Sequence, residues 1–254
     1  MVLRDPDQSR APIVGIAERY GRGGVGMHSH KRAQIMFAIN GALTVRTDSG
    51  SWVLPPHRAL WVPAGLPHGI SVRSAIELRT LFVARCAKGF LPWKDCVVMD
   101  APPLIRELIL AMADTPWTYR PNGSEARLGR VLLDRLQGIS QQSVHLPEPV
   151  DARARRFTAH MYAHVDDRRP LAAICQDVGS STRTIERLFQ QDIGMSVGTW
   201  TQQLRLVFAL ELLAEGKPVG DVAFAVGYAN PSSFIAVFRG VFGVTPGRYF
   251  QRSG

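Results

Sequence analysis

Short apolar runs separated by glycine, proline and polar residues fill the first hundred positions of the chain. The runs lie at residues 35–39, 43–46, 52–54, 59–62 and 77–84, and they are rich in β-branched and aromatic side chains. Regularly spaced runs of this length are typical of strands in a sandwich or barrel rather than of helices. We therefore predict a β-domain over residues 1–100.

After Pro103 the apolar residues recur at a helical period. Two stripes follow, in which apolar residues recur every three or four positions (Leu104, Ile105, Leu108, Ile109 and Met112; Leu128, Val131, Leu132, Leu136 and Ile139). They predict two helices in a connecting segment over residues 101–140. Residues 141–150 contain two prolines and no period, which indicates a linker between domains.

Residues 151–254 are predicted to be all helical, and they contain one unit twice. The segment "LAAICQDVG" at 171–179 matches "VGDVAFAVG" 48 positions later, and "GMSVGTW" at 194–200 matches "GVTPGRY" 49 positions later. Each copy has a first helix, a glycine turn (Gly179 or Gly227), capping residues such as Ser181 or Asn230, and a second helix. This order predicts two helix-turn-helix units and an α+β fold class for the whole chain.

An almost continuously apolar helix is predicted between the two units, over roughly residues 198–215. Eighteen residues at about 1.5 Å each span about 27 Å. Such a helix is expected to be mostly buried and to hold the two units apart. Their second helices, about one DNA turn or 34 Å apart, are then able to enter successive major grooves on one face of the duplex.

Composition and charge limit the class of protein. The chain is 46% hydrophobic and 20% charged, which is typical of a globular protein and not of a disordered one. We find no apolar run of roughly 18 residues, no secretory signal in the first ten residues and no paired cysteine spacing, so we expect a cytoplasmic protein that does not bind a membrane. The net charge of +9 favours a polyanionic partner without identifying it.

The region from Asp151 onward resembles the DNA-binding domain of the AraC/XylS family of transcription regulators. The resemblance is carried by "SSTRTIERLFQQDIGMS" and by "GYANPSSFIAVFR" with the "TPGRY" that follows, and it covers about 100 residues. It implies a one-component, effector-responsive regulator that binds a double-stranded DNA operator. It also implies that the helices of residues 101–140 form a homodimer interface.

By position, the family's base-facing residues on the first recognition helix fall on Arg183, Glu186 and Arg187. Arginine is suited to guanine and glutamate to cytosine in the major groove. The equivalent positions of the second helix are Ser232, Ser233 and Ala236, which are shorter than the residues many members carry, so we expect the two half-sites to be read unevenly. Phosphate contacts are expected from four positions, of which Ser233 also belongs to the base-facing set (Ser181, Thr182, Ser233 and Arg239).

The amino-terminal half contains a second resemblance. His28, His30 and Gln34 share parity, so on one strand all three would project from the same face. With Gly41, and with "PAGLPH" ending at His68, they resemble the two cupin motifs, whose ligands hold a divalent metal inside a small β-barrel. Gln34 stands where the motif has glutamate, and Arg22 replaces the first glycine of the motif.

This resemblance implies a cupin-like sensor with His28, His30, Gln34 and His68 as ligands of a zinc, nickel, iron or manganese ion. The alternative is a pocket that binds an organic effector without metal, as regulators of this type often do. In both cases the four residues are expected to line the effector pocket, with Trp61 as an apolar wall or as plain core.

Two other functions remain open on the sequence. Three histidines permit a metal-dependent cupin enzyme of the dioxygenase or isomerase type, but that function leaves the duplicated unit unexplained and lacks a further general acid or base. The short side chains of the second recognition helix also permit a DNA binder without sequence preference. We favour a sequence-specific regulator that is not an enzyme.

Overall fold

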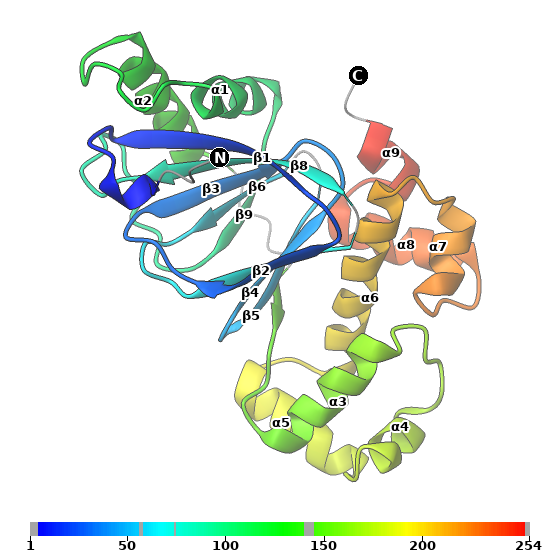
Figure 1. Cartoon of the computed structure of the whole chain (residues 1–254). Coiled ribbons are helices and arrows are strands. Elements are labelled where there is room, and N and C mark those ends of the chain that lie inside the picture. Colours follow the sequence, from blue (N-terminus) through cyan, green and yellow to red (C-terminus); the bar gives the residue numbers. More distant parts are fainter. Residues whose placement is uncertain (1–4, 56–57, 74, 140–144, 252–254) are drawn as a thin grey trace. The chain divides into compact units, whose positions relative to one another are not determined.

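The computed structural model describes residues 5–55, 58–73, 75–139 and 145–251 of the chain (Figure 1). It divides into two compact units, of which the first comprises Met1–Asp48 and Trp52–Ser143 and the second Ser49–Ser51 and Val144–Gly254. None of the helices in these described ranges is both long enough and apolar enough to cross a membrane.

Among the residues that the structure describes, two five-stranded sheets make up the β-structure (Figure 1). The order in the first sheet is β1 (Ile13–Tyr20), β8 (Ile76–Val83), β3 (Ala33–Ala38), β6 (Arg58–Val62) and β9 (Val97–Asp100). The order in the second sheet is β10 (His145–Pro147), β5 (Gly50–Leu54), β4 (Leu43–Thr47), β7 (His68–Val72) and β2 (Gly23–His28). The first sheet is antiparallel throughout, as are the pairings of β7 with β2 and β4. All five predicted strands are present.

Alternation along the strands separates two cores in the first unit. On β3, Met36 packs with residues of both sheets, whereas Ile35 and Phe37 face the opposite way. Ile35 and Phe37 pack against the two predicted helices, α1 (Pro103–Ala113) and α2 (Ser124–Gln137). A short 3-10 helix, η1 (Pro6–Gln8), precedes β1.

Seven helices occupy the described part of the second unit. They are α3 (Ala152–Ala163), α4 (Leu171–Asp177), α5 (Thr182–Ile193), α6 (Val197–Ala214), α7 (Val219–Ala225), α8 (Pro231–Phe242) and α9 (Pro246–Gln251). The predicted repeat is confirmed, because α4 and α5 are joined at Gly179 as α7 and α8 are joined at Gly227, with φ of +68° and +84°. The side chains of Ser181 and Asn230 cap α5 and α8 by accepting backbone N–H groups.

The structure places a short strand within the predicted linker over residues 141–150. Residues 140–144 lie outside the described residues, but His145–Pro147 form strand β10, and Asp151 caps α3. The two prolines had hidden this strand, because proline removes an N–H that a sheet ladder would use. A three-residue strand at the end of the sheet order tolerates that loss.

Candidate functional site

Helix α5 has one buried face and one polar face. Ile185, Leu188 and Phe189 are buried against the rest of the unit. Arg183, Glu186 and Arg187 are exposed, and their spacing of three and four residues places them together on the opposite face. Sequence reasoning had assigned these three residues to base contacts, and the structure leaves all three accessible to a DNA groove.

The start of α5 is built around Ser181 and Arg187. The Ser181 side-chain oxygen accepts the Thr184 N–H at 3.2 Å, so one lone pair of that hydroxyl is used by the helix itself. Thr182 is half-buried, which limits how far its hydroxyl can reach. One turn later, Arg187 Nη1 donates to Gln191 Oε1 at 2.7 Å. This bond steers the guanidinium along the exposed face of the helix.

Helix α8 repeats this arrangement with shorter side chains. Phe234 and Phe238 are buried, while Ser232, Ser233 and Ala236 are exposed. Arg239, three residues after Ala236, is also exposed and is the one long cation of the helix. The surface that α8 presents is therefore smooth and weakly charged compared with that of α5.

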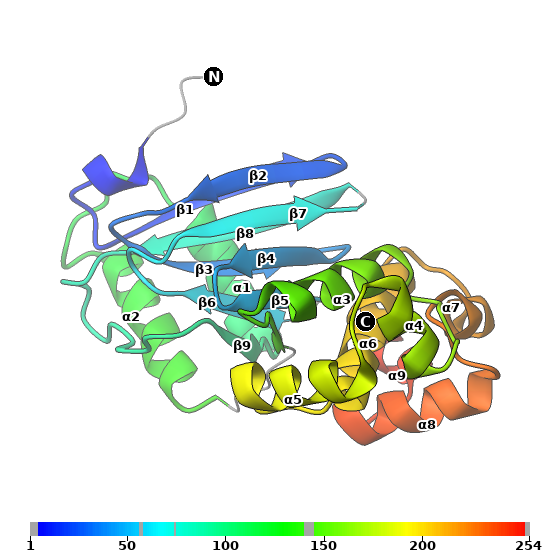
Figure 2. The same ribbon diagram turned by 90° about the horizontal axis from the view of Figure 1, so that it is seen from below.

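Helix α6 joins the two helix-turn-helix units. It is 18 residues long, as predicted, and ten of its residues are buried. Trp200 contacts Tyr162 and Phe189 edge to face, and its indole Nε1 donates to the Pro147 carbonyl at 2.8 Å. Figure 2 shows α5 and α8 along the same edge of the second unit. The two recognition helices therefore lie along one edge of this unit.

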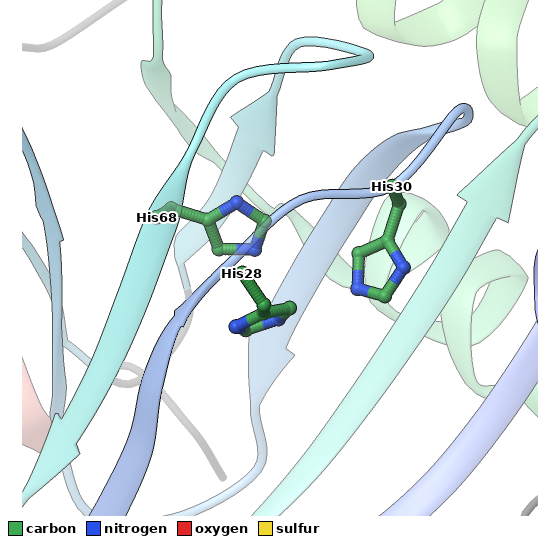
Figure 3. A group of neighbouring side chains, drawn as sticks. All are labelled: His28, His30 and His68. Atoms are coloured by element: carbon green, nitrogen blue, oxygen red, sulfur yellow. The ribbon is translucent and has the colours of Figure 1, made fainter.

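Three histidines meet in the first unit (Figure 3). His28 ends β2, His68 begins β7, and His30 lies in the segment that follows β2. The ring centroid of His28 lies 5.0 Å from that of His30 and 4.5 Å from that of His68. One ring nitrogen from each of the three lies within 4.8 Å of the other two. The two sequence motifs are tied together because the Gly65 N–H donates to the His30 carbonyl at 2.7 Å.

Hydrogen bonds and burial prepare these imidazoles to act as ligands. The Nδ1 atoms of His28 and His68 donate to the carbonyls of Gly26 and Leu66, each at 2.8 Å, so the Nε2 lone pair of each neutral ring points elsewhere. Burial lowers the pKa of His68 to about 4. Burial, and to a smaller degree His28, lowers the pKa of His30. His30 and His68 are therefore neutral near pH 7 and able to donate lone pairs.

The prediction that His28, His30 and Gln34 share one strand is wrong. The strand that ends at His28 is in the second sheet, and Gln34 is on β3 in the first sheet. Gln34 has the parity of Met36, so it faces the space between the sheets; it is 3% exposed, and its Oε1 has no hydrogen-bond partner. Gln34 thus remains a candidate ligand, although the parity that suggested it was fortuitous.

Trp61 is not a wall of the histidine site. Its neighbours on β6, Leu60 and Val62, face the space between the sheets, whereas Trp61 faces the helices. There it contacts Phe90 and Trp93 edge to face. Of the two roles expected for Trp61, the structure therefore supports plain core.

Sequence reasoning missed an N-terminal segment near His30. The buried Arg32 donates to the carbonyls of Ser9 and Ala11, and the Lys31 N–H donates to Asp7 Oδ2 at 2.9 Å. Asp7 Oδ1 is buried without a hydrogen-bond partner, and its charge acts on His30. A single aspartate 23 positions before His30 has no signal in the sequence that would have linked the two.

Comparison with known proteins adds independent findings. Residues 10–84 match a family model described as an AraC-like ligand binding domain, and residues 174–252 match one described as a helix-turn-helix domain. The chain is 34% identical over 226 residues to the HTH-type transcriptional regulator NimR of Escherichia coli K12, covering 89% of this chain and 82% of that regulator. It is 29% identical to the HTH-type transcriptional activator RhaR of Pectobacterium atrosepticum, covering 71% and 66%.

The structure of wild-type ToxT from Vibrio cholerae with bound unsaturated fatty acid is 12% identical, covers 95% of this chain and 96% of that one, and gives a TM-score of 0.41.

Proposed function

The chain belongs to the AraC family of transcriptional regulators, and from this premise we propose that it reads one operator through two successive major-groove sites. The family relationship makes it a regulator with a ligand-binding and a DNA-binding domain, and not an enzyme. The cupin enzyme that the sequence left open is set aside on this ground. A cytoplasmic location, where the protein meets chromosomal DNA, is part of the proposal.

The observation that carries this proposal is that α5, which has an exposed polar face, lies along the same edge of the unit as α8 (Figure 2). Arg183 and Arg187 have the donors that recognise guanine O6 and N7, and Glu186 can accept from cytosine N4. Ser232, Ser233 and Ala236 present short side chains to the second groove and discriminate less. Four residues near the helix starts and on α8 contact phosphates in this arrangement (Ser181, Thr182, Ser233 and Arg239).

In vitro selection tests this function directly. The full chain is expected to enrich duplexes from a random library that share two motifs about one helical turn apart, with the motif under α5 the more sharply defined. Affinity for the enriched duplex is then compared with that for a scrambled duplex at one stated salt concentration, since phosphate contacts make both affinities salt-dependent. A ratio near one would favour the architectural binder that ignores sequence.

We further propose that the amino-terminal unit senses a small molecule or a metal ion at the histidine site. His28, His30 and His68 supply three imidazoles, and Gln34 supplies an amide oxygen, which together fit a zinc, nickel, iron or manganese ion. The donor set carries no carboxylate, and buried Gln34 Oε1 and His68 Nε2 both lack a hydrogen-bond partner. A metal ion would satisfy both atoms and would leave a coordination position for an effector.

Replacing His28 and His68 together by alanine is expected to abolish metal loading. Wild-type protein purified in metal-supplemented medium should carry up to about one transition-metal ion per chain, and the double variant should carry none because two of three imidazoles are gone. Elemental analysis of both proteins measures this. The variant His164→Ala, which changes an exposed histidine of the second unit, should load like wild type. Absence of metal from every sample would leave only the organic effector.

The helices α1 and α2 are the proposed homodimer interface. Leu104 on α1 and Val131 on α2 are 54% and 44% exposed, although both belong to the apolar stripes that predicted these helices. Apolar side chains exposed on adjacent helices are typical of surfaces that bind a second chain. Two chains joined in this way would engage repeated half-sites, and sedimentation analysis of the purified protein tests the association.

A further inference from the structure

Arg205 on α6 spans the gap between the two helix-turn-helix units. Its Nη2 donates to the Asp167 carbonyl at 2.7 Å and its Nε donates to the Val165 carbonyl at 3.3 Å. Both carbonyls lie between α3 and α4, on the side of the first helix-turn-helix unit. On the other side, the guanidinium carbon lies 5.9 Å from the centre of the ring of Tyr228, the residue that follows the turn of the second helix-turn-helix unit. One half-buried side chain thus contacts both units.

The turn of the second helix-turn-helix unit lies close to this guanidinium. A Cβ added to Gly227 would lie 2.9 Å from Arg205 Nη2 and 3.1 Å from its Cζ. A Cβ on Gly179, the equivalent residue of the first helix-turn-helix unit, would meet nothing within 4 Å. Both glycines have positive φ, but only the second is also required by the close approach of another side chain. The contact is therefore specific to the second unit.

A cavity lies beside Arg205, with residues of both helix-turn-helix units in its lining. This cavity has a volume of about 580 Å³. It is lined by Ile174 and Val197 on the side of the first helix-turn-helix unit and by Tyr228 and Val237 on the side of the second. The hydrogen bonds and the ring contact of Arg205 cross it.

We propose that Arg205 is the positioning residue that sets the angle between the two recognition helices and, through it, the spacing of the two DNA sites that the protein accepts. This inference rests on the proposed function, since it requires α5 and α8 to read one duplex. Planarity matters here, because a guanidinium can donate to two carbonyls and lie against an aromatic ring at the same time. Lysine or glutamine cannot reproduce that geometry.

The experiment measures how affinity depends on the separation of the two DNA motifs. The selected operator is lengthened or shortened by one and two base pairs between the motifs, and each duplex is titrated with wild type, Arg205→Lys and Arg205→Gln. Wild type is expected to lose about tenfold in affinity for each one-pair change, an amount comparable to one mismatched base pair. Both variants should bind the native spacing more weakly, and their affinity should fall by less than about threefold for each one-pair change, which is a flatter spacing profile than that of wild type.

Two controls separate positioning from folding. Arg168→Gln changes an exposed arginine that lines the same cavity, and it should keep the wild-type profile. A duplex carrying only the motif read by α5 should bind the Arg205 variants as tightly as wild type, because the first recognition helix is untouched.

A further variant tests the contact from the side of the turn. Gly227→Ala, whose added methyl group would press on the guanidinium, should flatten the spacing profile as the Arg205 variants do.

Sharp spacing profiles in both Arg205 variants, equal to that of wild type, would overturn the role of this residue and leave the proposed function intact. Equal binding of wild type to every duplex, scrambled ones included, would overturn both.

Discussion

Arg187→Ala is expected to lower affinity for the selected operator by about 1–3 kcal/mol, or roughly 5- to 150-fold, and to relax the preference at one base pair. The side chain is exposed on the polar face of α5, and the proposed function has its donors meet guanine O6 and N7 in the groove. Alanine removes both donors without disturbing the buried face of the helix. Mobility shifts on a panel in which each operator base is varied in turn measure the change.

Two further variants make the Arg187 result interpretable. Arg239→Ala removes an expected phosphate contact, so it should weaken every duplex in the panel by a similar factor and reduce the salt dependence of binding. Arg85→Ala, which changes an exposed side chain in the turn after β8, should change nothing in this assay. If Arg187→Ala weakened all sequences equally, Arg187 would be a phosphate contact and not a base reader.

Trp200→Ala is expected to destabilise the second unit by about 3–5 kcal/mol, the usual cost of removing a large buried aromatic side chain. Trp200 is fully buried between Tyr162 and Phe189, so truncation leaves a cavity where α3, α5 and α6 meet. It also leaves the Pro147 carbonyl without its indole donor. Urea unfolding followed by far-ultraviolet circular dichroism, which reports mainly the helices, measures the loss.

The chain offers its own control for this experiment. Trp200 is the only tryptophan after residue 117, and the other four lie in the first unit. Their fluorescence should therefore report a transition of the first unit that Trp200→Ala leaves in place. Trp200→Phe keeps a ring in the cavity and should cost less than alanine. A fluorescence transition that moves together with the circular dichroism transition would contradict a defect confined to the second unit.

The duplicated helical unit was predictable because its signals are local. A glycine at positive φ, a Ser or Asn cap and an apolar helical stripe each act within a few residues, and the two copies reinforce one another. The length of α6 followed from the same period. The exposed faces of α5 and α8 then followed from which residues were left after the apolar ones were buried.

The histidine site was less predictable because it depends on contacts between distant segments. Gly23, Gly24 and Gly26 give β2 no apolar alternation, so its end at His28 could not be placed, and parity was counted across a change of sheet. The role of Trp61 stayed open on the sequence for a similar reason. Its large side chain fits either face of β6, and only the position of the helices on the outer face decides between them.

The unequal side chains of α5 and α8 have a consequence for retargeting this regulator. The three exposed positions that are proposed to read bases on α5 have long side chains, whereas the corresponding positions on α8 have small ones. Exchanging those three would redirect the protein to a new promoter while α8 continued to hold the neighbouring groove. Base changes in a natural promoter would be tolerated under α8 and penalised under α5, so such promoters should diverge on one side only.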